Sequence, residues 1–186
     1  SNLPPALQYG WQTLEKGFTD AIFKKKISDE IQNSWFDGNG YTRSNSASSN
    51  PVSLSLPGIV TNGPDATVQI RYACNLGDHQ QQILLNDSLL GTDEFYDYKI
   101  IDRSFSVSPG LIGSNPKLRL YSPISDRNGL AQIKFRYPRV LSFDNASIAS
   151  FELAPSVSEQ YLEIQSFDVS AGEPVLWDLT NLRRLD

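Results

Sequence analysis

The sequence predicts an all-β fold, an antiparallel β-sandwich of the jelly-roll type with an irregular N-terminal extension. From residue 51 onward, short stretches alternate apolar and polar residues, which is typical of half-buried strands. Gly, Pro, Asn and Asp separate these stretches, and no amphipathic helix lies between them. No repeat of fixed period is visible, which argues against a propeller or a solenoid.

The bulk properties exclude several classes of partner. The 186 residues suffice for one domain, or for one domain with a small appendage. A net charge of -5 argues against a protein that neutralises the phosphates of nucleic acid. No apolar run is long enough for a transmembrane helix. We therefore expect no nucleic-acid partner and no membrane span.

Two residue counts are informative, one about the origin of the chain and one about disulfides. Methionine is absent, even at the first position, so we expect the chain to be part of a longer protein. Cys74 is the one cysteine, so an intrachain disulfide is impossible.

Residues 129–141 are predicted to form a central strand with one wet face. Ile133, Phe135 and Tyr137 share one phase of a period-2 pattern, and polar side chains occupy the other phase. Pro138 removes a hydrogen-bond donor, so the strand should end, bend or reach a sheet edge there.

Residues 1–50 are assigned to the N-terminal extension, and residues 51–186 to the sandwich domain. Between Trp11 and Gln32 the pattern fits a loose helical stripe or a strand, and Gly17 argues against one continuous helix. We favour a strand around residues 20–26.

The remaining strands follow in order along the chain. Asn86 and Asp87 should form the turn of a hairpin between residues 82–85 and 88–90. Residues 95–107 supply one long strand or two short ones. The other predicted strands cover residues 52–56, 68–74, 117–121, 148–153, 161–167 and 174–179.

Five short motifs in a fixed order carry a resemblance to a known family. They are NSWF (33–36), PVSLSLPG (51–58), LNDSLLG (85–91), GLAQIKFRYPRVL (129–141) and VLWDLTN (175–181). In this order they resemble the amino-terminal region of the type IX secretion system sortase and related gingipain-like cysteine peptidases.

The resemblance implies a β-sandwich that precedes a caspase-like catalytic domain in a large cell-surface protein of Bacteroidetes-type bacteria. It also implies a secreted location at the outer membrane, and partners in the downstream catalytic domain or in secretion-system components. No catalytic His and Cys motif of the family can be placed on this chain. We therefore assign no catalytic residue to it, and expect proteolysis only of a parent protein.

Cys74 and His79 are the only thiol and imidazole, so a thiol nucleophile within the chain would need both. Cys74 shares the strand phase of Val68, Ile70 and Tyr72, which buries it, whereas a reactive cysteine needs exposure. We interpret Cys74 as structural and His79 as a turn residue.

Two stretches could hold calcium. Asp37 and Asn39 begin like a calcium loop, but position twelve is Ser48 rather than Glu, so the EF-hand pattern fails. Asp87, Asp93, Glu94 and Asp97 form an acidic cluster that could hold calcium at a sandwich edge. A solvated loop is the commoner explanation, and we assign no metal-binding or cofactor-binding residue.

Aromatic residues offer a last candidate site, because flat rings stack on sugars. Trp177 is interpreted instead as an anchor to the next domain. The aromatic candidates, which could equally fill a core, are Trp11, Trp35, Tyr41, Tyr96 and Tyr98. We expect a non-catalytic accessory β-sandwich that positions a catalytic domain or cargo. The alternative is a carbohydrate-binding module, for which glycan is the partner.

Overall fold

The computed structural model describes residues 5–19, 21–23, 26–27, 30–31, 40–42, 50–74, 77–124, 126, 128–170 and 172–185. Within them no helix has the length and apolar character needed to cross a bilayer. The strands of the sandwich are β1 (Gly10–Gly17), β6 (Val52–Ser53), β7 (Ala66–Cys74), β8 (Asp78–Leu85), β9 (Ser88–Tyr96), β10 (Lys99–Val107), β11 (Lys117–Tyr121) and β12 (Asn128–Arg139). One short helix, α2 (Pro109–Ile112), lies between β10 and β11.

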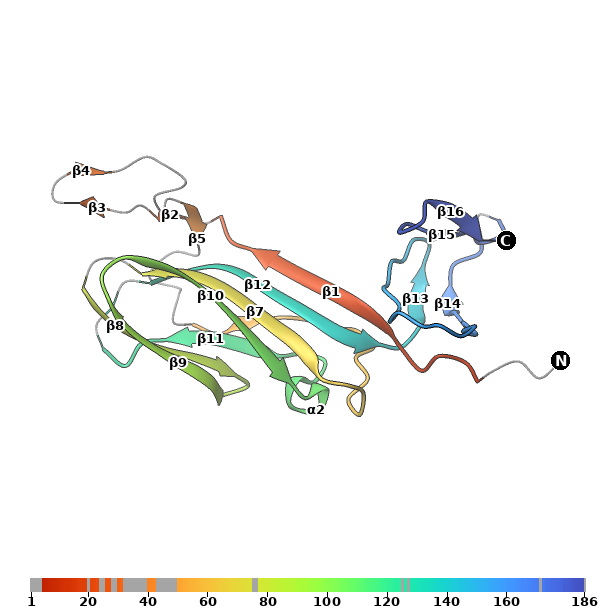
Figure 1. The fold of residues 1–186 in the computed structure, drawn as a ribbon, viewed down its shortest axis with the longest axis horizontal. Helices are drawn as coiled ribbons and strands as arrows, with labels where there is room; N and C mark the ends of the chain where they lie inside the picture. The colour runs from red at the N-terminus through yellow and green to blue at the C-terminus, as the bar shows by residue number, and fades with distance from the viewer. Residues whose placement is uncertain are drawn as a thin grey trace.

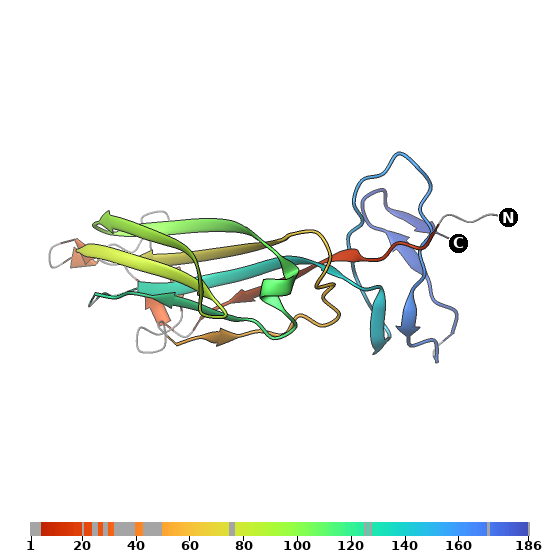
Figure 2. The same cartoon turned by 90° about the horizontal axis from the view of Figure 1, so that it is seen from below.

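These strands form two four-stranded sheets that pack face to face (Figures 1 and 2). The strand orders are β1-β12-β7-β10 and β6-β11-β8-β9, with antiparallel pairing throughout. When the strands are followed in chain order, the chain passes repeatedly from one sheet to the other, and these two strand orders are those of a jelly roll. The predicted fold class is confirmed.

β12 is the central strand that the sequence predicts. It pairs with β1 on one side and with β7 on the other. Its inward residues Ile133, Phe135 and Tyr137 are at most 1% exposed. Pro138 lies beyond the last β12–β7 pair, Arg136 with Thr67, so its missing donor removes no bond to β7.

The core fills the space between the sheets. Each fully buried aliphatic or aromatic side chain contributes about 1.5–3 kcal/mol through the hydrophobic effect. The fully buried members include Leu56, Val68, Ile83, Leu85, Leu118, Leu120, Leu130 and Phe135. The alternation predicted for residues 52–56 is present, and that for residues 68–74 holds as far as Tyr72, after which Ala73 and Cys74 are both buried.

The predicted hairpin turn is present between β8 and β9. Asn86 and Asp87 have φ values of 49° and 63°, as a two-residue type I′ turn requires. The Asn86 amide also donates to the carbonyl oxygens of Leu111 and Ile112, at 2.8 and 2.9 Å. The turn therefore fixes α2 as well as the hairpin.

The N-terminal part differs from the sequence-based division. Residues 10–17 were counted with the extension, but β1 pairs with β12 along its whole length and forms a sheet edge. The strand favoured around residues 20–26 is represented by β2 (Ala21–Phe23), which pairs with β5 (Gly40–Thr42). β3 (Lys26–Ile27) and β4 (Glu30–Ile31) form a second small pair.

Residues 140–170 and 172–185, called here the C-terminal unit, lie outside the two large sheets, at one end of the molecule (Figure 1). β13 (Ser142–Ala146) pairs with β14 (Gln165–Phe167), and β15 (Leu176–Asp178) pairs with β16 (Arg183–Leu185). The strand predicted over residues 148–153 is wrong: only Glu152 makes a bridge there, to Trp11. Apolar residues in that stretch resemble a strand in sequence, but among the described residues the pairing is limited to this single bridge with β1.

Candidate functional site

A polar cluster lies inside the sandwich at the end where β7 stops and β12 begins. It consists of Cys74, His79 and Asp126, whose nearest donor atoms all lie within 4.8 Å of one another. Cys74 is fully buried, and the side chains of His79 and Asp126 are 1% and 2% exposed. We call it the Cys74–His79–Asp126 cluster.

The chain path explains why these residues meet. Cys74 ends β7 in one sheet, and His79 is the second residue of β8 in the other. In β8 the burial alternates, so that His79 faces inward together with Gln81, Ile83 and Leu85. Asp126 precedes Asn128, which is the register partner of Cys74. The cluster therefore joins both sheets.

Hydrogen bonds orient these groups. His79 Nδ1 lies 2.7 Å from Asp126 Oδ1, and Gln81 Nε2 donates to Asp126 Oδ2. Asn128 Nδ2 donates to Gln81 Oε1 at 2.9 Å. The His79 ring packs on Phe95 with centroids 4.8 Å apart. These contacts turn the imidazole and the carboxylate toward each other.

The environment opposes a thiol nucleophile. Burial raises the pKa of the Cys74 thiol well above its ordinary value, and the negative charges of Asp126 and Asp93 raise it further. A nucleophile must be a thiolate that substrate can reach. The predicted burial of Cys74 is confirmed. The interpretation of His79 as a turn residue is wrong, because it lies in β8 and is 4% exposed.

The predicted acidic cluster does not converge on one point. Asp93 is buried, accepts a hydrogen bond from Tyr72 Oη at 2.5 Å, and is paired with Arg103. Burial alone would raise the pKa of Asp93, but the hydrogen bonds from Arg103 and Tyr72 outweigh it, and the net shift is downward. Asp93 is thus an anion whose charge is already neutralised.

The other three carboxylates have separate surroundings. Glu94 accepts a hydrogen bond from Gln80 at 2.8 Å, and Asp97 accepts one from the backbone of Tyr98 at 2.7 Å. Asp87 is exposed in the hairpin turn. Within the described part of the chain, donor atoms suited to a metal converge at the Cys74–His79–Asp126 cluster rather than here. Asp37 and Asn39, the start of the calcium-like loop, lie outside the described residues.

The aromatic candidates do not share one surface. Trp11 is covered by Arg136, whose guanidinium carbon lies 4.3 Å from the ring centroid, and pairs with Pro138 near the end of β12. Tyr98 lies at the opposite end of the sheet, because it precedes Lys99, which pairs with Cys74. Along β12 these two ends are marked by Pro138 and Asn128, which are about 33 Å apart at about 3.3 Å per residue. Burial raises the pKa of Tyr98 to about 12.

Of the other aromatic candidates, Tyr96 is 69% exposed. Trp35 lies outside the described residues, and so does the side chain of Tyr41. Among the predicted aromatic residues whose side chains the structure describes, Tyr96 is therefore the one that is exposed for stacking on a sugar.

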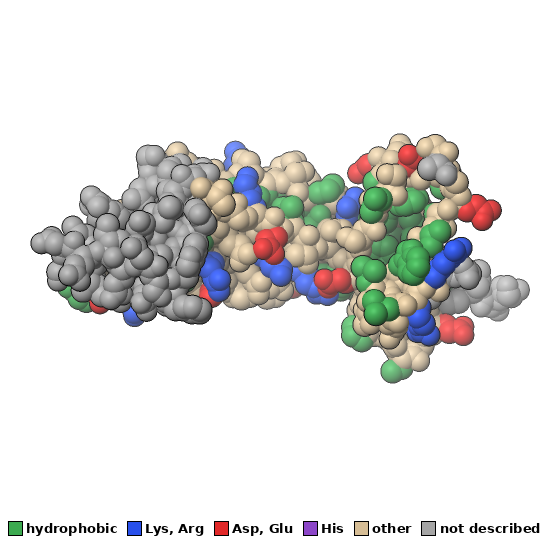
Figure 3. Space-filling view, turned by 90° about the horizontal axis from the view of Figure 1, so that it is seen from above, with side chains coloured by type: hydrophobic (Ala, Val, Ile, Leu, Met, Phe, Trp, Pro, Cys, Tyr) green, Lys and Arg blue, Asp and Glu red, His purple; other side chains and the backbone are tan. Residues whose placement is uncertain are grey.

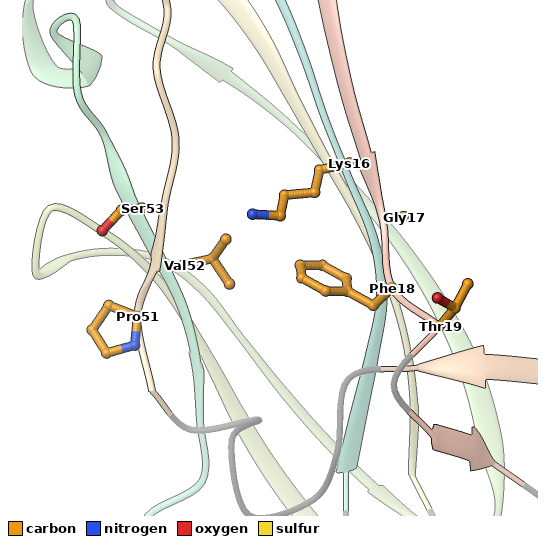
Figure 4. A pocket seen from close by; sticks show the side chains of 7 residues that line it. All are labelled: Lys16, Gly17, Phe18, Thr19, Pro51, Val52 and Ser53. Atoms are coloured by element: carbon orange, nitrogen blue, oxygen red, sulfur yellow. The ribbon is translucent and has the colours of Figure 1, made fainter.

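A cavity of about 370 Å³ opens between the end of β1 and β6 (Figure 4). Lys16, Phe18 and Val52 point toward its centre (Figure 4). Phe18 and Val52 belong to the core, and Lys16 is the one charged group among the lining residues. The cavity is therefore an opening at the edge of the core, without the convergent polar groups of a binding site.

The C-terminal unit carries a different kind of candidate site, a set of exposed large hydrophobic side chains. They gather over this unit in the space-filling view (Figure 3). Trp177, predicted to be a domain anchor, is 59% exposed. This C-terminal apolar surface consists of Val140, Ile148, Leu153, Val157, Tyr161, Ile164, Val169, Val175, Trp177, Leu179 and Leu182.

The C-terminal unit is attached to the sandwich at the start of β1. The backbones of Trp11 and Glu152 exchange two hydrogen bonds, of 2.7 and 2.8 Å, and Arg136 Nε lies 3.0 Å from Glu152 Oε2. Gly10 permits this contact, because a Cβ there would come within 3.0 Å of Leu141. The unit thus has a fixed place against the sheet edge.

Comparisons with known proteins identify the fold but no family. No family model and no curated protein sequence matches this chain. The chain is similar to dimeric latent PorU from Porphyromonas gingivalis, with a TM-score of 0.52 and 12% identity, over 81% of this chain and 15% of that one. At this identity the likeness is one of fold, and the chain spans only that 15% of PorU.

Two other solved structures are more distant. The carbohydrate-binding module CBM36, in complex with calcium and xylotriose, matches 67% of this chain and 98% of its own, with a TM-score of 0.35 and 12% identity. The Tobacco streak virus coat protein dimer matches 74% of this chain and 90% of its own, with a TM-score of 0.35 and 10% identity.

Proposed function

We propose that the chain is a non-catalytic accessory β-sandwich domain of a larger cell-surface protein, of the gingipain-like peptidase or type IX secretion sortase class. Its role is to position a neighbouring domain of the same polypeptide. The observation that carries the proposal is the C-terminal apolar surface. The order of the five sequence motifs and the PorU-like fold support it.

The apolar surface fits an interface between domains. Ile148, Leu179 and Leu182 are at least 75% exposed, and Trp177 is 59% exposed. Large exposed apolar patches on soluble domains mark contact sites, and aromatic residues are enriched in the centres of such contacts. Burial of these side chains against a second domain would remove a hydration cost that the domain alone carries.

Among the described residues, the chemistry of the side chains supports a role without catalysis. The one thiol is fully buried and its pKa is raised, so it is not a thiolate that substrate can reach, and Asp93 is already paired with Tyr72 and Arg103. A hydrolytic site needs a nucleophile and a base that substrate can reach. The activity of the larger protein therefore resides outside these residues.

Hydrogen–deuterium exchange tests the docking role directly. Exchange is compared between the 186-residue domain and the longer protein encoded by its gene. The amides of β13–β16 should exchange more slowly in the longer protein, because the docked domain covers them, while β7 and β12 should be unchanged. A longer protein with Trp177→Ser and Leu179→Ser should lose this added protection, and one with Ile100→Ser, exposed on β10, should keep it.

Equal exchange of β13–β16 in the two proteins would overturn the docking role. Peptidase or transpeptidase turnover by the 186-residue domain alone would overturn the non-catalytic role.

Carbohydrate binding remains a second candidate, favoured by one observation. The ring of Trp177 is exposed on a short two-stranded sheet, where a sugar could stack on it. Titration with soluble polysaccharides and lipopolysaccharide, followed by tryptophan fluorescence, tests it. Saturable quenching that Trp177→Ser abolishes would support glycan binding, and its absence across the panel would exclude this candidate.

A further inference from the structure

We propose that Cys74, His79 and Asp126 bind a structural zinc ion, which joins the two sheets at the end of the sandwich. The proposal is independent of the docking role, since the cluster and the C-terminal apolar surface share no residue. The ion would link the two sheets, which an intrachain disulfide cannot do because Cys74 is the one cysteine of the chain.

The donor set suits zinc. Zinc in proteins is bound by thiolate sulfur, imidazole nitrogen and carboxylate oxygen at about 2.0–2.3 Å, usually in a tetrahedron. The ligand atoms of such a tetrahedron lie about 3.3–3.8 Å apart. The three donors here lie within 4.8 Å of one another, so side-chain rotations that move atoms by about 1 Å complete the geometry. Calcium and magnesium prefer oxygen donors only, which disfavours them at a site with a sulfur ligand.

A second observation points to a cation at this place. Asn128 is 6% exposed, and its Oδ1 atom is buried without a hydrogen-bond partner. Asn128 is also the register partner of Cys74 in the β7–β12 ladder, and paired side chains on one face of a sheet lie side by side. A buried acceptor without a donor is costly, and a metal ion would satisfy it. Asn128 Oδ1 is therefore the fourth ligand.

Gln81 holds the two oxygen ligands in place. Its Nε2 donates to Asp126 Oδ2. Asp126 Oδ1 lies 2.7 Å from His79 Nδ1, and this hydrogen bond would give way when the carboxylate and the imidazole bind the ion. Its Oε1 accepts from Asn128 Nδ2 at 2.9 Å, which fixes the orientation of the Asn128 amide. Hydrogen bonds of this kind orient the ligands of most metal sites.

A shallow pocket of about 330 Å³ offers a way in for the ion. His79 and Phe95 line it, together with Asp78 and Glu94. These two carboxylates attract a divalent cation to the opening. Because four protein donors surround the ion, no coordination position stays open to substrate, and the site is structural rather than catalytic.

Metal content and thermal stability of the 186-residue domain test the proposal. The domain is purified without chelator for elemental analysis, then stripped with a chelator and titrated with zinc. We expect about one zinc per chain. At a free zinc concentration about 100 times Kd, the melting temperature should rise by about 5–10 °C above that of the stripped domain. With Co²⁺ in place of zinc, a sulfur-to-metal charge-transfer band should appear.

Variants separate ligation from packing. Loss of a residue that only orients a metal ligand lowers metal affinity by about 10- to 100-fold. Cys74→Ala removes a ligand itself, so it should weaken zinc binding by about 100-fold or more and abolish the charge-transfer band. Ile70→Val is the matched control: it removes one buried methyl group from the same strand, and should keep the full zinc-dependent shift. If Cys74→Ala fails to fold, Asp126→Asn serves, because it preserves the side-chain shape and weakens the site.

Two outcomes would overturn the proposal. One is a stripped domain whose melting temperature does not respond to zinc and which shows no charge-transfer band with Co²⁺. The other is a zinc-dependent shift of equal size in the Cys74→Ala or Asp126→Asn variant, which would indicate binding elsewhere on the surface.

Discussion

The sandwich buries most of its large hydrophobic side chains, whereas the C-terminal unit exposes many of them. In the sandwich, Phe135, Leu120 and Val68 are fully buried between two sheets. In the C-terminal unit, Ile148 and Leu182 are more than 80% exposed, although the unit also contains strands. The two regions differ in the size of their sheets, since the sandwich has two four-stranded sheets and the C-terminal unit has two two-stranded sheets.

This difference shows which part of the molecule is complete by itself. A sheet needs a second layer to bury one of its faces, and an isolated two-stranded sheet is marginally stable in water. The sandwich provides its own second layer, whereas the C-terminal unit relies on contacts such as that between Trp11 and Glu152. The following predictions test this comparison, from the largest expected effect to the smallest.

Phe135→Ala should reduce the free energy of unfolding by about 3–5 kcal/mol, because it leaves a cavity at the centre of the core. Urea denaturation followed by far-ultraviolet circular dichroism measures this loss. Lys134→Ala, on the wet face of the same strand, should change stability by about 0.5 kcal/mol or less. Equal effects of the two variants would contradict the assignment of the faces of β12.

Asp93→Asn should cost about 1–3 kcal/mol at neutral pH, because it removes charge-assisted hydrogen bonds from Arg103 and Tyr72. The pKa of Asp93 is lower in the folded state than its ordinary value of 3.8, so its stabilisation is complete above pH 3.8 and is lost as pH falls further. The difference between wild type and variant, measured by urea denaturation, should therefore shrink below that pH. Asp87→Asn, which removes the same charge from an exposed turn, should show about 0.5 kcal/mol or less at any pH.

Arg136→Ala should cost about 1 kcal/mol and should act on the junction rather than on the sandwich. Arg136 stacks on Trp11 and pairs with Glu152, both contacts being partly exposed. We expect faster hydrogen exchange at Glu152 and little change in β7. Unchanged exchange at Glu152 would mean that the backbone bonds alone hold the C-terminal unit.

Leu179→Ser should change the stability of the isolated domain by about 0.5 kcal/mol or less, because the side chain is 75% exposed. The same change should lower the binding of a hydrophobic dye. Thermal denaturation measures the stability, and a fluorescence titration measures the dye binding. A loss of more than about 2 kcal/mol would show that Leu179 belongs to a core, and would weaken the contrast between the two regions.

Local patterns predicted the sandwich well where each strand carries its own signal. The alternation in β12 and β7 identified their buried faces, and Asn86 with Asp87 identified the hairpin turn. β1 was missed as a sandwich strand because its pairing with β12 depends on a partner more than a hundred residues away, as in the hydrogen bond between Gln132 and Glu15. Such a partner leaves no local trace in the sequence.

The Cys74–His79–Asp126 cluster escaped prediction for a related reason. His79 and Asp126 are 47 residues apart, and no sequence pattern links the two positions. One signal was available: His79 is in phase with Ile83 and Leu85, so extending the predicted strand backward would have turned it inward. The exposure of Leu179 and Leu182 could not be predicted, because hydrophobicity does not reveal whether a covering layer exists.

The pairing of β1 with β12 also determines when the fold can form. Since β1 has no other neighbour in its sheet, Gly10–Gly17 stays unpaired until the chain has been synthesised as far as Arg139. Closing so long a loop carries an entropic cost before any contact repays it, and domains with such distant pairings fold in milliseconds to seconds. The β1–β12 edge of the sandwich can therefore form only after β12 has been synthesised, and β1 lacks its partner strand until then.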